Sequence, residues 1–128
     1  ARALGLQDTS FQNPIGFDDK DQWSTPRDVA WLAAFALRFP EIRARMSMSD
    51  AKIESNEGRT VALSHTHALL HKHTAVVAGK TGTTLGAGEC LVSVVQEHGR
   101  EYLVVLLNSA ARYVDMQVVL RALDDLRA

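Results

Sequence analysis

The stretch VVAGKTGTTLGAGECLVSVV, residues 76–95, decides the fold, because it sets a glycine-rich polar segment between two apolar runs. The apolar runs predict one strand over residues 75–84 and a second over residues 89–96. A third predicted strand, REYLVVLL at residues 100–107, follows after the short connection EHG. So short a connection favours an antiparallel hairpin, and the unbroken apolar character of the third strand suggests burial on both faces.

A helix is predicted on the N-terminal side of these strands. Thr25 can cap it, Pro26 suits its first position, and Asp28 places a carboxylate in the first turn, where the helix end is positive. Pro40 ends this helix, and EIRARM at residues 41–46 adds one short turn.

A second helix is predicted from about Ala111, capped by Ser109 or Asn108. Its apolar residues recur at helical spacing and form a stripe that can face the sheet. The stripe consists of Met116, Val119, Leu120, Leu123 and Leu126.

The remaining segments carry weaker signals. Residues 7–25 form a turn-rich connector, and residues 46–64 predict one or two short strands around a turn at SNEG. The segment THALLHKH at residues 66–73 is ambiguous between a helical turn and a loop.

Length and charge exclude several classes of protein. The chain has 128 residues, enough for about one domain. Its formal net charge of −1 gives no electrostatic footprint for nucleic acid or an anionic membrane. The sequence lacks an initiator methionine and opens on ARALGL, which is typical of the end of a helix with Gly5 as its C-cap. We therefore expect a chain trimmed at its N-terminus, whose lack of a targeting segment says nothing about compartment.

One interpretation of the polar segment is a phosphate-binding loop, which needs the pattern G-x-x-x-x-G-K-[ST] followed by a helix. Gly79, Lys80 and Thr81 supply the end of that pattern, but Thr74 stands where its first glycine belongs. A predicted strand, and not a helix, follows the segment. The phosphate loop is therefore disfavoured.

The other interpretation is the Lys-Thr-Gly strand of serine acyltransferases and hydrolases. That chemistry needs a cation and a hydroxyl for a substrate carboxylate, a residue without a side chain where a peptide docks, and a backbone N–H for the developing oxyanion. Lys80, Thr81, Gly82 and the N–H of Thr83 could supply these in that order. The triplet alone is a weak signal, because an exposed turn with a solvated lysine would look the same.

Longer blocks of sequence strengthen the second interpretation. ARALGLQDTSFQNPIGF at residues 1–17, WSTPRDVAWLA at 23–33 and the run from Val76 to Leu107 occur in this order, before a closing helix. Together they resemble the D-alanyl-D-alanine carboxypeptidases, which are low-molecular-mass penicillin-binding proteins. The resemblance implies an α/β (α+β) fold of the β-lactamase and transpeptidase type, a mainly antiparallel sheet flanked by helices. It implies no metal or organic cofactor.

The resemblance also implies what this chain does not contain. The family's nucleophile is the serine of a Ser-x-x-Lys motif far upstream of Lys-Thr-Gly, with Ser-x-Asn between them. The sequence has no Ser-x-Asn, and its one Ser-x-x-Lys, Ser49 to Lys52, follows the first two family blocks in a predicted strand region. We therefore expect residues 1–128 to be the C-terminal portion of one catalytic domain, without its nucleophile and inactive alone.

For the whole protein, the resemblance implies cleavage of a terminal D-Ala-D-Ala bond of peptidoglycan precursors through an acyl-enzyme, and acylation by β-lactams. Lys80 and Thr81 would bind the substrate carboxylate, Gly82 would let the peptide dock, and Thr83 N–H would serve the oxyanion. The protein would work in the periplasm or on the outer face of the cytoplasmic membrane. The alternatives are a serine β-lactamase or related acyl hydrolase of the same fold, and a non-catalytic module that binds a peptide.

Other reactive residues have simpler explanations. HTHALLHKH holds four of the five histidines, His65, His67, His71 and His73, and an exposed polar loop is favoured over a metal site. The family that the chain resembles often has asparagine near the positions of His65 and His67. Cys90 is predicted to be a buried, inert thiol and Glu89 an edge or solvent-facing residue. Trp23 and Trp31 are predicted to be core or interface anchors. Without its other half, the fragment is expected to self-associate through EYLVVLL and a stripe of Met116, Val119 and Leu123 that lacks part of its cover.

Overall fold

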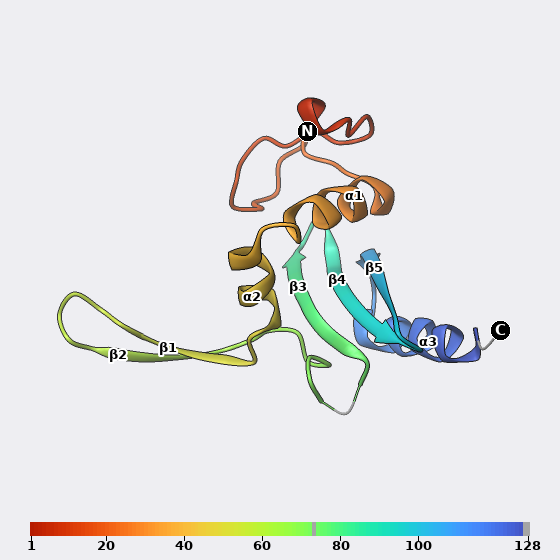
Figure 1. Ribbon diagram of the computed structural model, residues 1–128. Coiled ribbons are helices and arrows are strands. Elements are labelled where there is room, and N and C mark those ends of the chain that lie inside the picture. Colours follow the sequence, from red (N-terminus) through yellow and green to blue (C-terminus); the bar gives the residue numbers. More distant parts are fainter. Residues whose placement is uncertain (73, 127–128) are drawn as a thin grey trace.

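The computed structural model describes residues 1–72 and 74–126, and its centre is an antiparallel sheet with the strand order β3-β4-β5 (Figure 1). The strands are β3 (Val76–Thr84), β4 (Gly88–Glu97) and β5 (Arg100–Ser109). All three were predicted from the apolar runs, and the antiparallel hairpin between β4 and β5 is confirmed. A strand, and not a helix, follows the polar segment, which excludes the phosphate loop.

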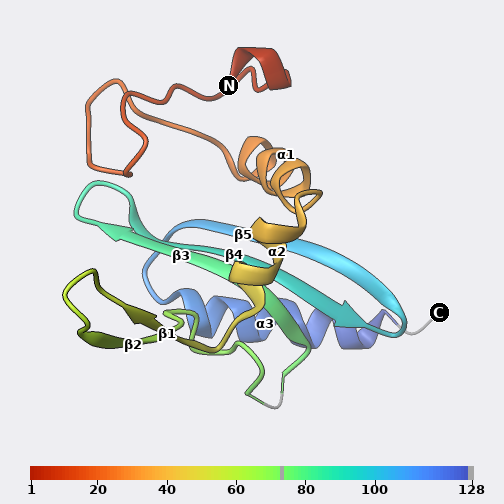
Figure 2. The same cartoon turned by 60° about the vertical axis from the view of Figure 1, so that its left-hand side comes forward.

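Helices cover both faces of this sheet (Figure 2). Helices α1 (Pro26–Ala36) and α2 (Pro40–Ser47) lie on one face, and α3 (Arg112–Asp125) lies on the other. The side chains of β4 alternate between these layers: Leu91 and Val95 pack with Met116 of α3, whereas Val94 faces the side of α1 and α2. This arrangement confirms the predicted antiparallel sheet with flanking helices.

The start of α1 follows its capping signals. Thr25 Oγ1 accepts a hydrogen bond of 3.2 Å from the backbone N–H of Asp28, and Pro26 occupies the first position. Asp28 is buried, and its carboxylate accepts from Asp8 N–H at 2.9 Å and from the Thr9 hydroxyl at 2.7 Å. It therefore ties the N-terminal connector to the helix. The prediction for residues 41–46 was too short, because Pro40 starts an eight-residue helix instead of only ending the one before.

Helix α3 covers the core more completely than the sequence suggested. Met116 is fully buried with Leu70, Val76, Leu91 and Val95, and Leu120 and Leu123 pack against this cluster. Met116 therefore has full cover within the chain, contrary to the expectation, whereas Val119 and Leu123 are only half-buried, and Leu126 is 62% exposed and does not belong to the cluster. The predicted cap was also wrong, since Ala111 is the N-cap and makes no side-chain capping bond.

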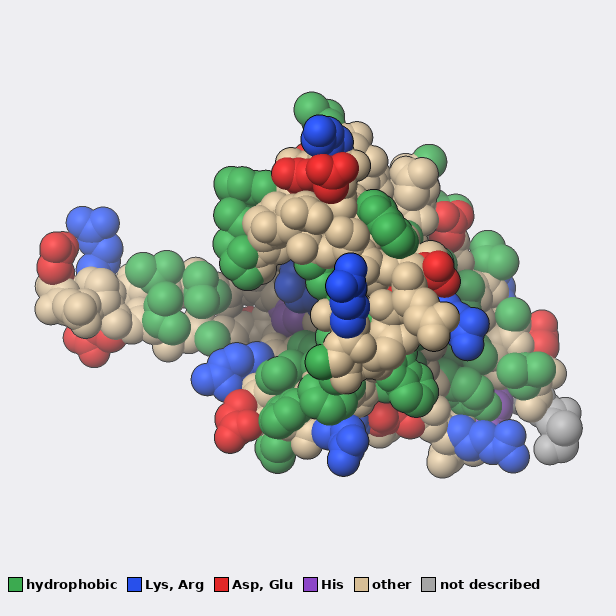
Figure 3. Space-filling model, turned by 90° about the horizontal axis from the view of Figure 1, so that it is seen from above, with side chains coloured by type: hydrophobic (Ala, Val, Ile, Leu, Met, Phe, Trp, Pro, Cys, Tyr) green, Lys and Arg blue, Asp and Glu red, His purple; other side chains and the backbone are tan. Residues whose placement is uncertain are grey.

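A two-stranded hairpin, β1 (Asp50–Glu54) with β2 (Thr60–Ser64), projects from the body as an arm (Figures 1 and 3). The predicted turn at SNEG joins its strands. At the N-terminus, η1 (Arg2–Leu4) ends at Gly5 in the left-handed region, as its C-cap signal predicted. In the described part of the chain, every helix is too short or too polar to cross a lipid bilayer.

Two burial predictions were wrong. Strand β5 is only half-buried over residues 102–107, and Cys90 is half-buried as well. Trp23 and Trp31 are 52% and 65% exposed, which excludes the core alternative for them, and their role as interface anchors stays a prediction. In each case apolar composition overstates burial, because a side chain is covered only where other elements of the fold reach it.

Candidate active site

Strand β3 lies at the edge of the sheet and carries the Lys-Thr-Gly triplet. It pairs with β4 on one side, and in residues 1–72 and 74–126 no strand pairs with its other side. Lys80, Gly82 and Thr83 are exposed, and Thr81 is half-buried. An edge strand with a free row of backbone donors and acceptors is the structure to which an extended peptide can add.

The lysine and the first threonine of the triplet lie on opposite faces of this strand. Lys80 is paired with Val92 and Thr81 with Leu91, whose side chains alternate across the sheet. The Lys80 ammonium folds back to donate to the carbonyl oxygen of Thr81. The Thr81 hydroxyl lies 2.6 Å from the hydroxyl of Thr66. An ammonium and two hydroxyls on a free strand edge suit an anionic group such as a carboxylate.

Arg112 supplies a second cation, which the sequence did not reveal. Its Nη1 donates to the carbonyl oxygen of Gly82 at 3.0 Å and to the Thr83 hydroxyl at 2.7 Å. The guanidinium lies over the ring of Tyr113, 5.2 Å from its centroid, and its buried Nε has no hydrogen-bond partner. Arg112 therefore fixes the end of the triplet strand, and only the folded position of α3 shows this.

Glu89 orients the start of that helix. Its carboxylate accepts a 3.0 Å hydrogen bond from Arg112 N–H, which is one of the unpaired donors at the helix N-terminus. Ser109 contributes as well, because its hydroxyl accepts from Ala111 N–H at 3.0 Å. The half-buried Glu89 is thus a capping residue, where a strand-edge or solvent-facing role had been predicted.

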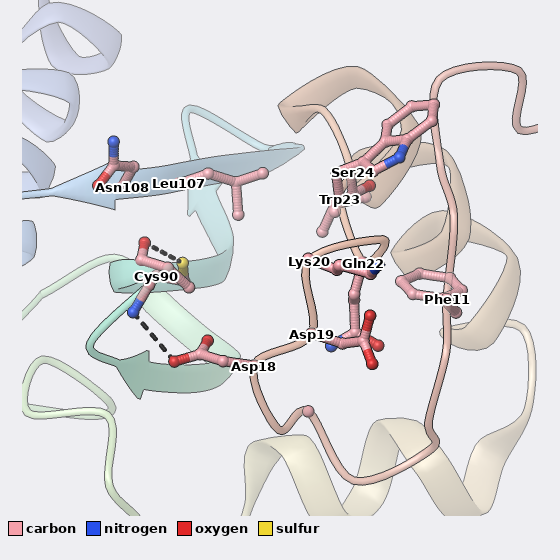
Figure 4. Close-up of a pocket in the computed structure, with 14 residues that line it drawn as sticks. Phe11, Asp18, Asp19, Lys20, Gln22, Trp23, Ser24, Cys90, Leu107 and Asn108 are labelled. Carbon is pink, nitrogen blue, oxygen red and sulfur yellow. Dashed lines mark hydrogen bonds between the residues drawn. The ribbon is translucent and has the colours of Figure 1, made fainter.

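The turn that follows the triplet is held from the connector. The Asp18 carboxylate accepts from the Thr84 hydroxyl at 2.5 Å. It also accepts from Gly86 N–H at 3.0 Å (Figure 4). The hydrogen bonds from Thr84 and Gly86, in that order, lower the pKa of Asp18. Nothing in the turn-rich connector singled out Asp18 beforehand.

A cavity of about 650 Å³ lies between the connector and strands β4 and β5 (Figure 4). Asp18, Trp23, Cys90 and Asn108 are among its lining residues, and Cys90 Sγ lies 3.5 Å from the carbonyl oxygen of Ala87. The Lys-Thr-Gly residues do not line it. We place the candidate site at the β3 edge because the charged and hydroxyl groups converge there.

The histidine segment lies against the same strand. His65 Nδ1 accepts from His67 N–H at 3.0 Å, and His71 bonds to the carbonyl oxygen of Ser47 at 2.8 Å. Burial lowers the pKa of His65, a backbone hydrogen bond with Gly79 opposes this, and electrostatic interactions with Lys80 and with His71 lower it further. Seen from above, histidine and basic side chains lie in the hollow between the hairpin arm and the body (Figure 3).

These histidines do not gather as metal ligands. The rings of His65 and His67 are 6.4 Å apart, His67 is already hydrogen-bonded through both nitrogens, and His73 lies outside the described residues. Across the described ranges, the one group of three possible ligands is Glu97, His98 and Asp124 at the β4–β5 turn. It lies apart from the triplet, because the triplet pairs with residues 90–92 of β4.

The Ser-x-x-Lys match has the wrong surroundings for a nucleophile. Ser49 lies in an exposed bend, and Lys52 lies on the exposed strand β1 of the hairpin arm. The predicted strand region is thereby confirmed. A serine activated by a neighbouring lysine needs both side chains held together, which an exposed hairpin does not provide.

The antiparallel sheet with helices on both faces, and the triplet on its edge strand, together have the fold of the penicillin-binding proteins. The crystal structure of the Streptomyces K15 DD-transpeptidase superposes on the chain with a TM-score of 0.85, at 23% sequence identity over 94% of this chain and 49% of that one. A sequence model of the D-alanyl-D-alanine carboxypeptidases matches residues 1–111. The chain therefore belongs to the D-alanyl-D-alanine carboxypeptidase family.

Two curated relatives agree with this assignment. The chain is 31% identical to the D-alanyl-D-alanine carboxypeptidase DacA of Haemophilus influenzae over 120 residues, 90% of this chain and 28% of the relative. It is 26% identical to the D-alanyl-D-alanine carboxypeptidase DacF of Bacillus subtilis over 110 residues, 86% of this chain and 28% of the relative. The chain thus spans between a quarter and a third of the length of these two relatives.

Proposed function

We propose that this chain is the C-terminal portion of the catalytic domain of a serine-type D-Ala-D-Ala carboxypeptidase. The longer polypeptide that would contain it is called the parent protein here. The observation that carries the proposal is the free edge of β3, where the Lys80 ammonium, the paired hydroxyls of Thr66 and Thr81, and Arg112 converge. Membership of the family supports it independently.

In the proposed reaction, the peptide adds to the edge of β3 and its terminal carboxylate binds to Lys80 and Thr81. Gly82 leaves room for the peptide backbone. A serine from the rest of the parent protein attacks the carbonyl carbon of the D-Ala-D-Ala bond, and Thr83 N–H stabilises the oxyanion. The C–N bond breaks and D-alanine leaves after its amine gains a proton. Water then hydrolyses the acyl-enzyme and regenerates the serine.

A β-lactam would follow the same path as far as the acyl-enzyme, so it reports on the same site. Because the proposed substrate is peptidoglycan, the parent protein would work outside the cytoplasmic membrane. No step of this path calls for a metal or an organic cofactor.

The test is to incubate the parent protein with a fluorescent penicillin and, separately, with a peptide that ends in D-Ala-D-Ala. We expect one covalent label per molecule and release of D-alanine, both weakened when Lys80 is replaced by alanine. Fast turnover of penicillin without D-alanine release would instead indicate a β-lactamase. Absence of both label and release would indicate a binding module and refute the proposed function.

A further inference from the structure

His67 lies underneath the strand that carries the Lys-Thr-Gly triplet. Its side chain is 2% exposed and is one of the largest fully buried side chains of the described chain. The residue follows β2 by three positions and reaches across to Ser93 of β4, where its Nε2 lies 2.8 Å from the hydroxyl. Ser93 is fully buried and is the register partner of Gly79, directly before Lys80.

The hydrogen bonds of His67 fix its tautomer. Nδ1 accepts from Leu69 N–H at 3.3 Å, so this nitrogen carries no proton. Nε2 is then the protonated nitrogen of a neutral ring, and it donates to Ser93 Oγ. A doubly protonated imidazolium cannot accept from Leu69, so it would break one of these two bonds.

The ring also occupies the space next to Gly79. A Cβ atom at Gly79 would lie 2.3 Å from Cδ2 of His67, far inside contact distance. The imidazole therefore packs directly on the backbone of the residue that precedes Lys80. Movement of the ring would release the β3 backbone at that point.

The neighbours of His67 extend this contact around the triplet. Thr66, the preceding residue, holds the Thr81 hydroxyl at 2.6 Å. The Tyr113 hydroxyl accepts a hydrogen bond from Ala68 N–H and donates one to Thr66 O, both at 2.9 Å. It therefore holds the backbone on either side of His67. Arg112, next to Tyr113, bonds to the end of the triplet.

We propose that neutral His67 is a positioning residue for the proposed reaction: it locks the segment 65–69 onto β3 and so keeps the Thr81 hydroxyl and the triplet backbone in place for the carboxylate of the substrate. It touches no substrate atom itself and acts through Gly79, Ser93 and Thr66. The effect on catalysis rests on the proposed function. The lock, by which we mean the contacts through which His67 holds segment 65–69 on β3, is a property of this chain alone.

The groups around His67 make the lock sensitive to acid. Arg112 and Tyr113 face it from α3, His65 from its own segment, Ser93 from β4, and Lys80 stands beside Gly79 on β3. Burial, with smaller effects from the charges of His65 and Arg112, lowers the pKa of His67 to about 4. As the pH falls toward 4, His67 should therefore become protonated and release segment 65–69 from β3.

The experiment compares four forms of the full-length parent protein: wild type, His67→Gln, His67→Ala and His98→Asn. Glutamine keeps a donor for Ser93 but does not titrate, and His98 at the β4–β5 turn is an exposed histidine remote from the triplet. Asparagine tolerates the positive φ of 49° at that position. Hydrogen exchange of residues 79–83 at pH 7 and the second-order rate of acylation by fluorescent penicillin from pH 7 to pH 4 are measured.

We expect His67→Ala to raise exchange of residues 79–83 roughly tenfold while leaving the β4–β5 turn unchanged, and His98→Asn to behave as wild type. The ratio of the acylation rate of wild type to that of His67→Gln should fall as the pH drops from 6 to 4. A ratio that stays flat would overturn the inference, and so would unchanged exchange in His67→Ala.

Two further outcomes separate this inference from the proposed function. If the wild-type protein reacts with neither penicillin nor the peptide, the proposed function fails, while the exchange data still decide whether His67 locks β3. If the variants do not fold, nitrogen NMR of the wild-type imidazole decides. A protonated Nε2 and a bare Nδ1 at neutral pH support the lock, and the opposite tautomer overturns it.

Discussion

The two glycines that flank Lys80 and Thr81 should respond in opposite ways to the addition of one methyl group. A Cβ at Gly79 would lie 2.3 Å from the ring of buried His67 and 2.8 Å from the carbonyl oxygen of Val92. A Cβ at Gly82 would meet its nearest neighbour, Cβ of Cys90, only at 4.0 Å, which is ordinary contact. Alanine should therefore fit at the second position and not at the first.

The cost at Gly79 follows from what must move. Both contacts are shorter than 3.0 Å, so the His67 ring must move away and the β3 backbone must also shift from Val92 O on the central strand. Overpacking in a core costs about 1–3 kcal/mol, and expelling the ring leaves Ser93 without its partner at a further cost of about 1–3 kcal/mol. We expect Gly79→Ala to lower the free energy of unfolding by about 2–6 kcal/mol. Gly82→Ala should change it by less than about 1 kcal/mol, because glycine within a strand is itself unfavourable.

The assay pairs urea unfolding of the parent protein, followed by tryptophan fluorescence, with acylation by fluorescent penicillin. Gly82→Ala should fold normally but be acylated at least roughly tenfold more slowly, because the methyl group stands where the peptide is proposed to dock. Wild-type stability of Gly79→Ala would refute the packing argument around His67. Normal acylation of Gly82→Ala would refute the docking role of the β3 edge.

Four further predictions follow from the same geometry. Lys80→Ala should reduce kcat/KM of the parent protein roughly 10- to 150-fold, because one charge-assisted hydrogen bond to the substrate is lost. The melting temperature should not change, because Lys80 is exposed. A lower melting temperature with normal turnover would contradict the proposed role of Lys80. The isolated chain should form no penicillin adduct by intact mass spectrometry, and an adduct on Ser49 would show that the nucleophile was misassigned. The pKa of His67 is about 4 in the folded chain and about 6.5 in the unfolded chain, so the neutral ring stabilises the fold fully above pH 6.5. The free energy of unfolding should then fall by about 3 kcal/mol as the pH drops to 4. Urea unfolding of His67→Gln should show a flatter dependence on pH than wild type. The isolated chain should self-associate through the outer edge of β5, and a monodisperse monomer in light scattering would count against this.

Local signals predicted the local features of this fold. Continuous apolar runs located β3, β4 and β5, and the Thr25 cap located α1, because these patterns act between residues close in sequence. Contacts between distant residues had no such signal. Thr66 meets Thr81 across 15 positions, Arg112 meets Thr83 across 29, and Asp18 meets Gly86 across 68. Each depends on how whole elements pack, so the triplet was found from the sequence but the residues that hold it were not.

The alternation of β3 explains how four consecutive residues can serve four different tasks. Lys80 pairs with Val92, and Gly82 with Cys90, so these two residues point to the side of α1 and α2. Thr81 pairs with Leu91, and Thr83 bonds to Arg112, so the two threonines point to the side of α3. The strand thus presents a cation on one face and hydroxyls on the other. The layers of helix occupy both faces, whereas the edge of β3 has no strand partner in the described ranges. A substrate that touches the cation and the hydroxyls together must therefore lie along that edge, and we expect the serine of the parent protein to approach from the same side.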